Sequence, residues 1–205
     1  MVTVARRDEP AETLEAIYLA PGPGITRGAV LAPPHPLYGG SLDSPVLTEL
    51  AFACTKVGIG SLRFNWRGVG ASAGEPSGGA AEADCDYGSA LDHLADTVAG
   101  PLVAGGYSFG AAAALRAAAS TPPVDRLLLV APPPALVEPA AIAGTRRRTL
   151  VLAGEYDTIA PARALRAAFE KVPQVELRVI PHADHFFGEG LSELARLVAA
   201  WLEDA

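Results

Sequence analysis

The feature that most constrains the fold of this chain is a regular alternation of two hydrophobic patterns. Seven short apolar runs of the β type are separated by segments in which apolar residues recur every three or four positions. Such alternation from end to end, without an internal repeat, is typical of a doubly wound, mostly parallel sheet of the α/β class. The predicted strands are Leu14 to Leu19, Ala29 to Ala32, Gly60 to Phe64, Pro101 to Ala104, Asp125 to Val130, Thr149 to Leu152 and Val175 to Ile180.

The segments between these strands carry apolar stripes of helical spacing. Three stripes are clear: Leu47, Leu50, Ala51 and Cys54; Tyr87, Leu91, Leu94 and Val98; and Leu191, Leu194, Val198 and Trp201. A stripe of this width buries one face of a helix. We therefore expect helices to cover the sheet, and the loops after the strands to carry the chemistry.

The size and charge of the chain limit its class and its partners. Its 205 residues, half of them hydrophobic, are enough for one core, so we predict a single domain over residues 1–205. A net charge of −7 disfavours nucleic acid as a partner, because phosphate binding needs a concentrated basic surface. The N-terminal segment lacks an apolar signal core, and no apolar stretch is long enough to span a membrane. We expect a cytoplasmic protein with no membrane partner, of undetermined oligomeric state.

The cysteine content agrees with a reducing compartment. Cys54 and Cys85 are the two cysteines, and each lies at an apolar position of a predicted helix. A soluble chain with two cysteines in such positions is better explained by reduced thiols than by a disulfide. We predict that both are core thiols.

A G-x-S-x-G pentapeptide at residues 106–110 supplies a candidate nucleophile, Ser108. It follows a predicted strand and precedes the alanine-rich run Ala111 to Ala119. A serine on such a sharp strand-to-helix turn needs small residues two positions to either side, and its hydroxyl is exposed at the end of the sheet. A second match at residues 70–74 contains Ser72, but a glycine-rich loop follows it instead of a helix. Ser108 is therefore the predicted nucleophile.

A serine hydroxyl needs a general base, and His185 is the predicted one. It follows the last predicted strand and precedes the last helix, and it is flanked by Phe186 and Phe187. His182 is the competitor, three residues earlier. A metal site built from His182, Asp184 and His185 is a weak alternative, because no further ligand cluster accompanies them, and we predict no metal.

The group that orients the base should lie on the loop after the strand Thr149 to Leu152. Asp157 lies on that loop before a helix opened by Pro161, in the chain order serine, acid, histidine. Asp157 could also cap the turn or the helix. Glu155 is the alternative acid.

An oxyanion hole needs two backbone N–H donors. One should belong to Phe109, directly after the predicted nucleophile. The other should come from residues 33–40, where prolines lack an N–H and leave His35, Leu37 or Tyr38. Of these we favour His35 or Leu37.

With these residues identified, the chain resembles the small, lidless bacterial α/β-hydrolases, which are related in sequence to dienelactone hydrolase and acyl-peptidase-type domains. The resemblance covers nearly the whole chain. It rests on His35-Pro36-Leu37-Tyr38-Gly39-Gly40, Arg63-Phe64-Asn65-Trp66-Arg67-Gly68-Val69-Gly70-Ala71-Ser72, the turn at Ser108, Gly154-Glu155-Tyr156-Asp157 and Ala183-Asp184-His185-Phe186-Phe187. The family usually has His-Pro-His-Pro at the first of these sites, whereas Pro33 and Pro34 precede His35 here. The resemblance also implies that the segment containing Arg67 and Ser72 has a structural role.

The residues and the resemblance together imply a serine hydrolase that cleaves a small carboxylic ester or thioester through an acyl-enzyme, without a cofactor. Two alternatives use the same fold: a binding protein without catalysis, and an acyltransferase with the same three residues. The connection from Ala131 to Arg148, where a lid is normally inserted in this fold, is short and rich in proline. We expect it to form a low rim that leaves the pocket open.

Overall fold

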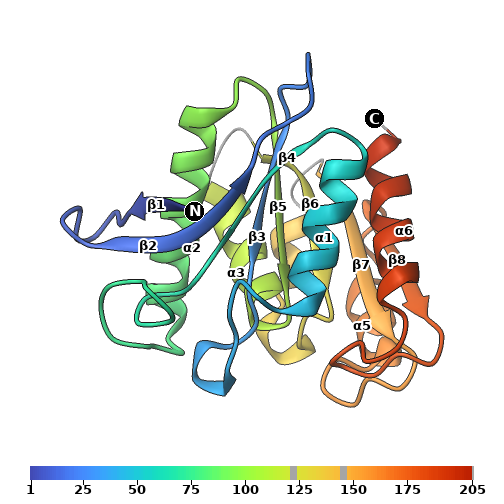
Figure 1. The fold of residues 1–205 in the computed structure, drawn as a ribbon. Helices are drawn as coiled ribbons and strands as arrows, with labels where there is room; N and C mark the ends of the chain where they lie inside the picture. The colour runs from blue at the N-terminus through green and yellow to red at the C-terminus, as the bar shows by residue number, and fades with distance from the viewer. Residues whose placement is uncertain (121–123, 144–146, 205) are drawn as a thin grey trace.

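The sheet has the mostly parallel, doubly wound architecture that the sequence predicts. The computed structural model describes residues 1–120, 124–143 and 147–204, and within them eight strands form one sheet in the order β1-β2-β4-β3-β5-β6-β7-β8 (Figure 1). The strands are β1 Val2–Ala5, β2 Thr13–Leu19, β3 Gly28–Ala32, β4 Gly60–Phe64, β5 Leu102–Tyr107, β6 Val124–Val130, β7 Arg148–Gly154 and β8 Val175–Ile180. β2 pairs antiparallel with both β1 and β4, and the remaining pairs are parallel.

Helices flank this sheet on two sides. The longer helices are α1 Pro45–Lys56, α2 Ala80–Thr97, α3 Phe109–Ser120, α5 Ala162–Phe169 and α6 Leu191–Glu203. In Figure 1, α1 lies beside α6 in front of the sheet, whereas α2 and α3 lie together behind it. The loops that follow β3, β5, β7 and β8 meet at the lower edge of the sheet in that view. Parallel strands bring these loops to one edge, so residues distant in sequence can form one site.

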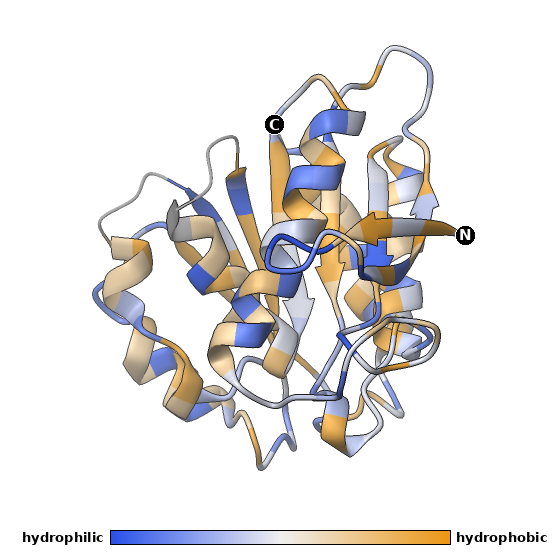
Figure 2. Cartoon of the chain, turned by 90° about the vertical axis from the view of Figure 1, so that its left-hand side faces the viewer, coloured by the Kyte–Doolittle hydropathy of each residue, from blue (hydrophilic) through white to orange (hydrophobic). Residues whose placement is uncertain are grey.

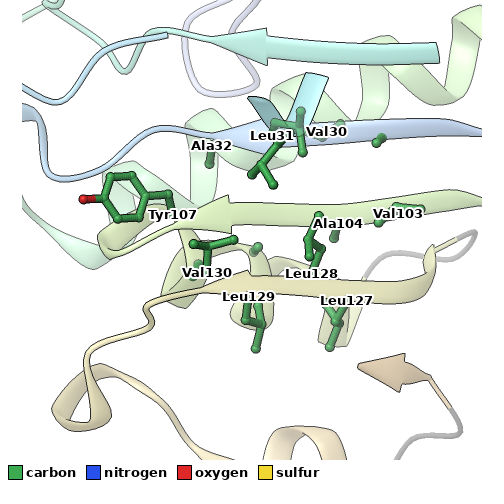
Figure 3. Packing of buried hydrophobic residues seen from close by; sticks show 14 of the residues in the cluster. Val30, Leu31, Ala32, Val103, Ala104, Tyr107, Leu127, Leu128, Leu129 and Val130 are labelled. Atoms are coloured by element: carbon green, nitrogen blue, oxygen red, sulfur yellow. The ribbon is translucent and has the colours of Figure 1, made fainter. Parts of the chain in front are cut away.

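The core is built from the central strands, whose side chains are buried on both faces. Every residue of β3 and β5 is buried, and so is all of β6 except Asp125. Continuous runs of this kind are expected of parallel strands covered by helices on both sides. Figure 3 shows side chains of the three neighbouring strands β3, β5 and β6; the register places Leu31 and Leu128 on one face of the sheet, on either side of Gly105, and Val30, Ala104 and Leu127 on the other. Figure 2 shows the same pattern for the molecule, with hydrophobic strands inside and hydrophilic patches on the helices.

The structure adds elements that the periodicity did not predict. The edge strand β1 has four residues, too few to produce a clear alternation, and it pairs with β2 from Val2 opposite Ala16 to Ala5 opposite Thr13. The structure corrects one of the two cysteine predictions. Cys54 is buried, as a core thiol should be, whereas Cys85 on α2 is only half-buried, so the prediction of two core thiols is wrong for Cys85. Burial raises the pKa of the Cys54 thiol to about 12.

The connection between β6 and β7 contains no cap over the sheet edge in its described part. It holds the 3-10 turn η2 (Pro134–Leu136) and the five-residue helix α4 (Pro139–Ala143). Residues 144–146 of this connection lie outside the described residues. The prediction of a fold without a substantial lid is confirmed by solved structures of the same architecture, reported below.

Candidate active site

Ser108 occupies a strained turn between β5 and α3. Its φ angle is 54°, a left-handed conformation that is uncommon outside glycine. The two glycines of the pentapeptide make the turn possible, because a Cβ on Gly106 would lie 2.4 Å from the Gly110 carbonyl oxygen. A Cβ on Gly110 would lie 2.4 Å from the carbonyl oxygen of Ala32. Only glycine fits at these positions, so the turn brings Ser108 to the end of the sheet as the sequence predicts.

The structure brings together the three side chains predicted as nucleophile, base and orienting acid. The Nε2 atom of His185 lies 3.0 Å from Ser108 Oγ, and its Nδ1 atom lies 2.8 Å from Asp157 Oδ2. All three residues are buried, with 9% or less of each exposed. A buried imidazole bonded on one side to a carboxylate and on the other to a hydroxyl can accept the proton of that hydroxyl.

Asp157 has a second set of partners within its own loop. Its Oδ1 atom accepts the N–H of Ile159 over 2.8 Å and the N–H of Ala160 over 2.6 Å. These bonds fix the carboxylate plane before α5 begins. The loop-stabilising role and the His185 contact therefore use different oxygens of the same side chain.

Tyr107 holds the loop that carries His185, a role that the sequence did not indicate. Its hydroxyl donates to the backbone carbonyl oxygen of His185 over 2.7 Å. Figure 3 shows the Tyr107 ring beyond the end of β5, with its hydroxyl directed away from the core. Burial raises the pKa of this phenol, so it stays protonated and can donate. No pattern in the sequence distinguishes this tyrosine from a core aromatic residue.

The alternative candidates Glu155, His182 and Ser72 have other partners. Glu155 accepts the backbone N–H of His182 over 2.8 Å, and the His182 side chain is 70% exposed. Ser72 donates to the Asn65 carbonyl oxygen over 3.0 Å and accepts the N–H of Glu15 over 2.9 Å. These groups therefore stabilise loops.

Arg67, in the same segment as Ser72, has a structural environment as well. Its guanidinium binds the Asp86 carboxylate on α2 at 2.8 Å and Asp8 at 3.1 Å. The backbone N–H of Arg67 donates to Asp86 too. Arg67 ties its loop to α2 and to the N-terminal segment.

The loop after β3 lies against the turn at Ser108. Trp66 fixes it by donating its Nε1–H to the carbonyl oxygens of Pro33 and Pro34, at 3.2 Å and 3.0 Å. The His35 ring packs 4.7 Å from the Phe109 ring, centroid to centroid. The loop is therefore held where an N–H could reach a group bound at Ser108.

The predicted oxyanion donors differ in how their N–H groups are used. The Leu37 N–H donates to His35 Nδ1 over 3.3 Å, and Leu37 does not line the pocket. The Tyr38 N–H donates to the His35 carbonyl oxygen over 3.1 Å. Within the described residues, neither the His35 N–H nor the Phe109 N–H makes a hydrogen bond. His35 and Phe109 are therefore the two candidates whose backbone N–H groups are available to donate to a bound oxyanion.

A pocket of about 640 Å³ opens beside the Ser108 hydroxyl. Its volume falls within the range of about 300–1,000 Å³ that is usual for small-molecule sites. Loops after β3, β5, β6, β7 and β8 contribute its walls, and most of the lining is apolar. In the part of the chain that the structure describes, no group of three or more His, Cys, Asp or Glu side chains is placed to hold a metal ion. No helix among the described residues is long and apolar enough to cross a membrane.

Solved structures with this architecture are numerous, although no protein-family model matches the chain. A structure from Coxiella burnetii, described as an α/β serine hydrolase homologue, is 31% identical, with coverage of 94% of this chain and 93% of that one and a TM-score of 0.85. A protein from Xanthomonas campestris, described as an α/β serine hydrolase without a lid, is 28% identical over 99% of this chain and 93% of that one, with a TM-score of 0.83.

A third structure, from Agrobacterium tumefaciens, is 28% identical over 98% of this chain and 94% of that one, with a TM-score of 0.88. Each similarity extends over more than nine-tenths of both chains, so it includes the sheet and the loops at its edge. Together with the sheet order and the turn at Ser108, these similarities show that the chain belongs to the small, lidless α/β-hydrolases.

Proposed function

We propose that this chain is a serine hydrolase that cleaves a small carboxylic ester or thioester through an acyl-enzyme on Ser108. The observation that carries the proposal is the unbroken hydrogen-bond chain from Asp157 Oδ2 through His185 to Ser108 Oγ, with links of 2.8 Å and 3.0 Å. In this role His185 is the general base, and Asp157 keeps its Nδ1 protonated so that Nε2 is free to accept a proton.

The reaction proceeds in two steps, acylation of Ser108 and hydrolysis of the acyl-enzyme. Ser108 Oγ attacks the substrate carbonyl carbon while its proton passes to His185 Nε2, and the same proton then passes to the departing alcohol or thiol as its bond to carbon breaks. A water molecule attacks the acyl-enzyme in the second step, again through His185, and releases the acid with free Ser108. No cofactor takes part in these steps.

The negative charge that develops on the carbonyl oxygen needs donors that are already in position. We assign this role to the N–H groups of Phe109 and His35. Phe109 is the first residue of α3, so its N–H lies at the positive end of the helix dipole. Fixed donors of this kind typically contribute about 100-fold to 1,000-fold each in kcat.

A fluorophosphonate probe tests the proposal directly. The folded protein should be labelled, peptide mapping should place the adduct on Ser108, and Ser108→Ala should remove the label. His185→Ala should slow labelling by several orders of magnitude, whereas His182→Ala, the matched control, should leave it unchanged because His182 contacts Glu155 instead. Adduct on Ser72, or no labelling of folded protein, would contradict the proposal.

A further inference from the structure

The pocket beside Ser108 has no formally charged side chain in its wall. Its described lining contains no lysine, arginine, aspartate or glutamate. Apart from the predicted nucleophile and base, the polar side chains that line it are His35, Tyr38, Ser44 and Tyr107. Two of these are already engaged, because Tyr107 donates to the His185 carbonyl oxygen and His35 Nδ1 accepts the Leu37 N–H. Burial lowers the pKa of His35, which keeps that ring neutral near pH 7.

Three arginines on neighbouring elements, Arg63, Arg67 and Arg116, bind other groups, and the exposed Arg163 and Arg166 on α5 do not line the pocket. Arg63 on β4 donates to Thr48 Oγ1 over 2.6 Å, and Arg116 on α3 binds Asp84 at 2.8 Å. Arg67 binds Asp86, as described above. An anionic group in this pocket would therefore lose its water without gaining a counter-ion, which is strongly unfavourable. The net charge of −7 adds a general repulsion of polyanions.

Large aliphatic and aromatic side chains, including the ring of Tyr38, are exposed at the mouth of the pocket. Tyr38 is 87% exposed, Phe186 70%, Ile159 49% and Leu136 44%. They come from four different loops, after β3, β8, β7 and β6, yet all line the same pocket. Exposed apolar residues are normally scattered singly, and a cluster around one opening indicates a ligand-binding surface. An apolar ligand body seated here would cover them.

We propose that the site takes neutral esters or thioesters with an apolar body, and that it discriminates against carboxylate-bearing acyl groups and coenzyme A thioesters. The inference rests on the proposed function and narrows it. Coenzyme A carries several phosphate charges, and the described pocket lining offers none of them a cationic partner. Apolar walls and an uncharged rim instead favour substrates whose only strongly polar centre is the reacting carbonyl.

Two matched substrate pairs test this selectivity. The first is mono-p-nitrophenyl succinate against its methyl ester, and the second is S-butyryl coenzyme A against S-butyryl-N-acetylcysteamine. The neutral member of each pair should have a kcat/KM at least about tenfold higher, because the charged member is desolvated without a counter-ion. Equal values, or a preference for the charged member, would overturn the inference.

A charge introduced at the rim provides the complementary test. Leu136→Arg should reduce the preference for the methyl ester over the succinate several-fold, whereas Ile25→Arg, at an exposed apolar residue that does not line the pocket, should not. An unchanged preference in Leu136→Arg would contradict the inference. If Leu136→Arg fails to fold, the two substrate pairs still test the inference on the unmodified protein.

The two proposals fail in different ways. Labelling of Ser108 by a fluorophosphonate together with a preference for charged esters would refute only the neutral substrate class. Absence of both labelling and ester cleavage in folded protein would refute the serine hydrolase itself.

Discussion

Asp157 offers the sharpest test of the site, because its two oxygens have separate tasks. Oδ2 contacts His185 Nδ1, and Oδ1 accepts two backbone N–H groups of its own loop. Asp157→Asn can keep the loop bonds through its amide oxygen and place its NH₂ group against His185. Because that group donates, Nδ1 must become an acceptor, and the ring proton moves to Nε2. Nε2 can then no longer accept the Ser108 proton.

The expected loss of kcat for Asp157→Asn is about 10,000-fold, the scale found when a catalytic histidine is held in the wrong tautomer. The loop bonds survive as weaker, neutral ones, so Tm should fall by only about 2–4 °C. Asp157→Ala should lose at least as much activity and also remove both loop bonds. Bonds to a charged acceptor are worth about 1.5–3 kcal/mol each, so this variant should lose about 3 kcal/mol or more, and Tm about 6–12 °C.

The assay combines hydrolysis of p-nitrophenyl butyrate with thermal unfolding followed by circular dichroism. Glu155→Gln is the matched control, since Glu155 lies on the same loop and contacts His182 instead of His185. It should retain kcat within a few-fold. The reasoning is refuted if Asp157→Asn retains kcat within tenfold of the unmodified enzyme, or if Glu155→Gln proves the more damaging change.

The remaining predictions concern the support of the site and the N-terminal segment. Tyr107→Phe removes the bond to the His185 carbonyl oxygen and should lower kcat about tenfold with KM unchanged, as steady-state kinetics would report. Gly110→Ala places a Cβ 2.4 Å from the Ala32 carbonyl oxygen and should cost about 1–3 kcal/mol in urea unfolding, whereas Gly188→Ala meets no atom within 4 Å and should cost nothing. The Arg6 hydrogen bonds hold the pKa of the Asp8 carboxyl well below its usual value, so its stabilising effect is present above the unfolded pKa and is lost as pH falls. Asp8→Asn should therefore lower Tm at pH 7, by an amount that shrinks below about pH 4.

The central strands could be predicted because their pattern has one physical explanation. A run such as Leu127-Leu128-Leu129-Val130 has no polar face to present to water, so it fits only a strand covered on both sides. The edge strand Val2–Ala5 could not be predicted in this way, because it has no such apolar run. Its four residues gain their stability from pairing with Thr13–Leu19, and that partner is visible only once the chain has folded.

The loops that carry the predicted triad could be found for a related reason. Each lies directly after a recognisable strand, and parallel strands deliver such loops to a single edge. The choice of oxyanion donor could not be made in this way. It depends on which N–H groups already donate hydrogen bonds within the loop, and the Leu37 N–H donates to the side chain of His35. The same holds for Tyr107, whose contact with the His185 carbonyl joins residues 78 positions apart.

The two G-x-S-x-G pentapeptides show why context outweighs the motif itself. The Ser72 hydroxyl accepts the N–H of Glu15 on β2 and donates its proton to the Asn65 carbonyl oxygen. Ser108, held at a φ angle of 54°, directs its hydroxyl toward an imidazole nitrogen instead. A helix begins at the next residue, Phe109, and leaves that N–H unpaired within the described residues. The helix therefore distinguishes the two serines: Ser72 lies in a loop and binds backbone groups, whereas Ser108 lies beside His185 and beside a helix N-terminus. The sequence indicates this helix by the alanine-rich run after Gly110.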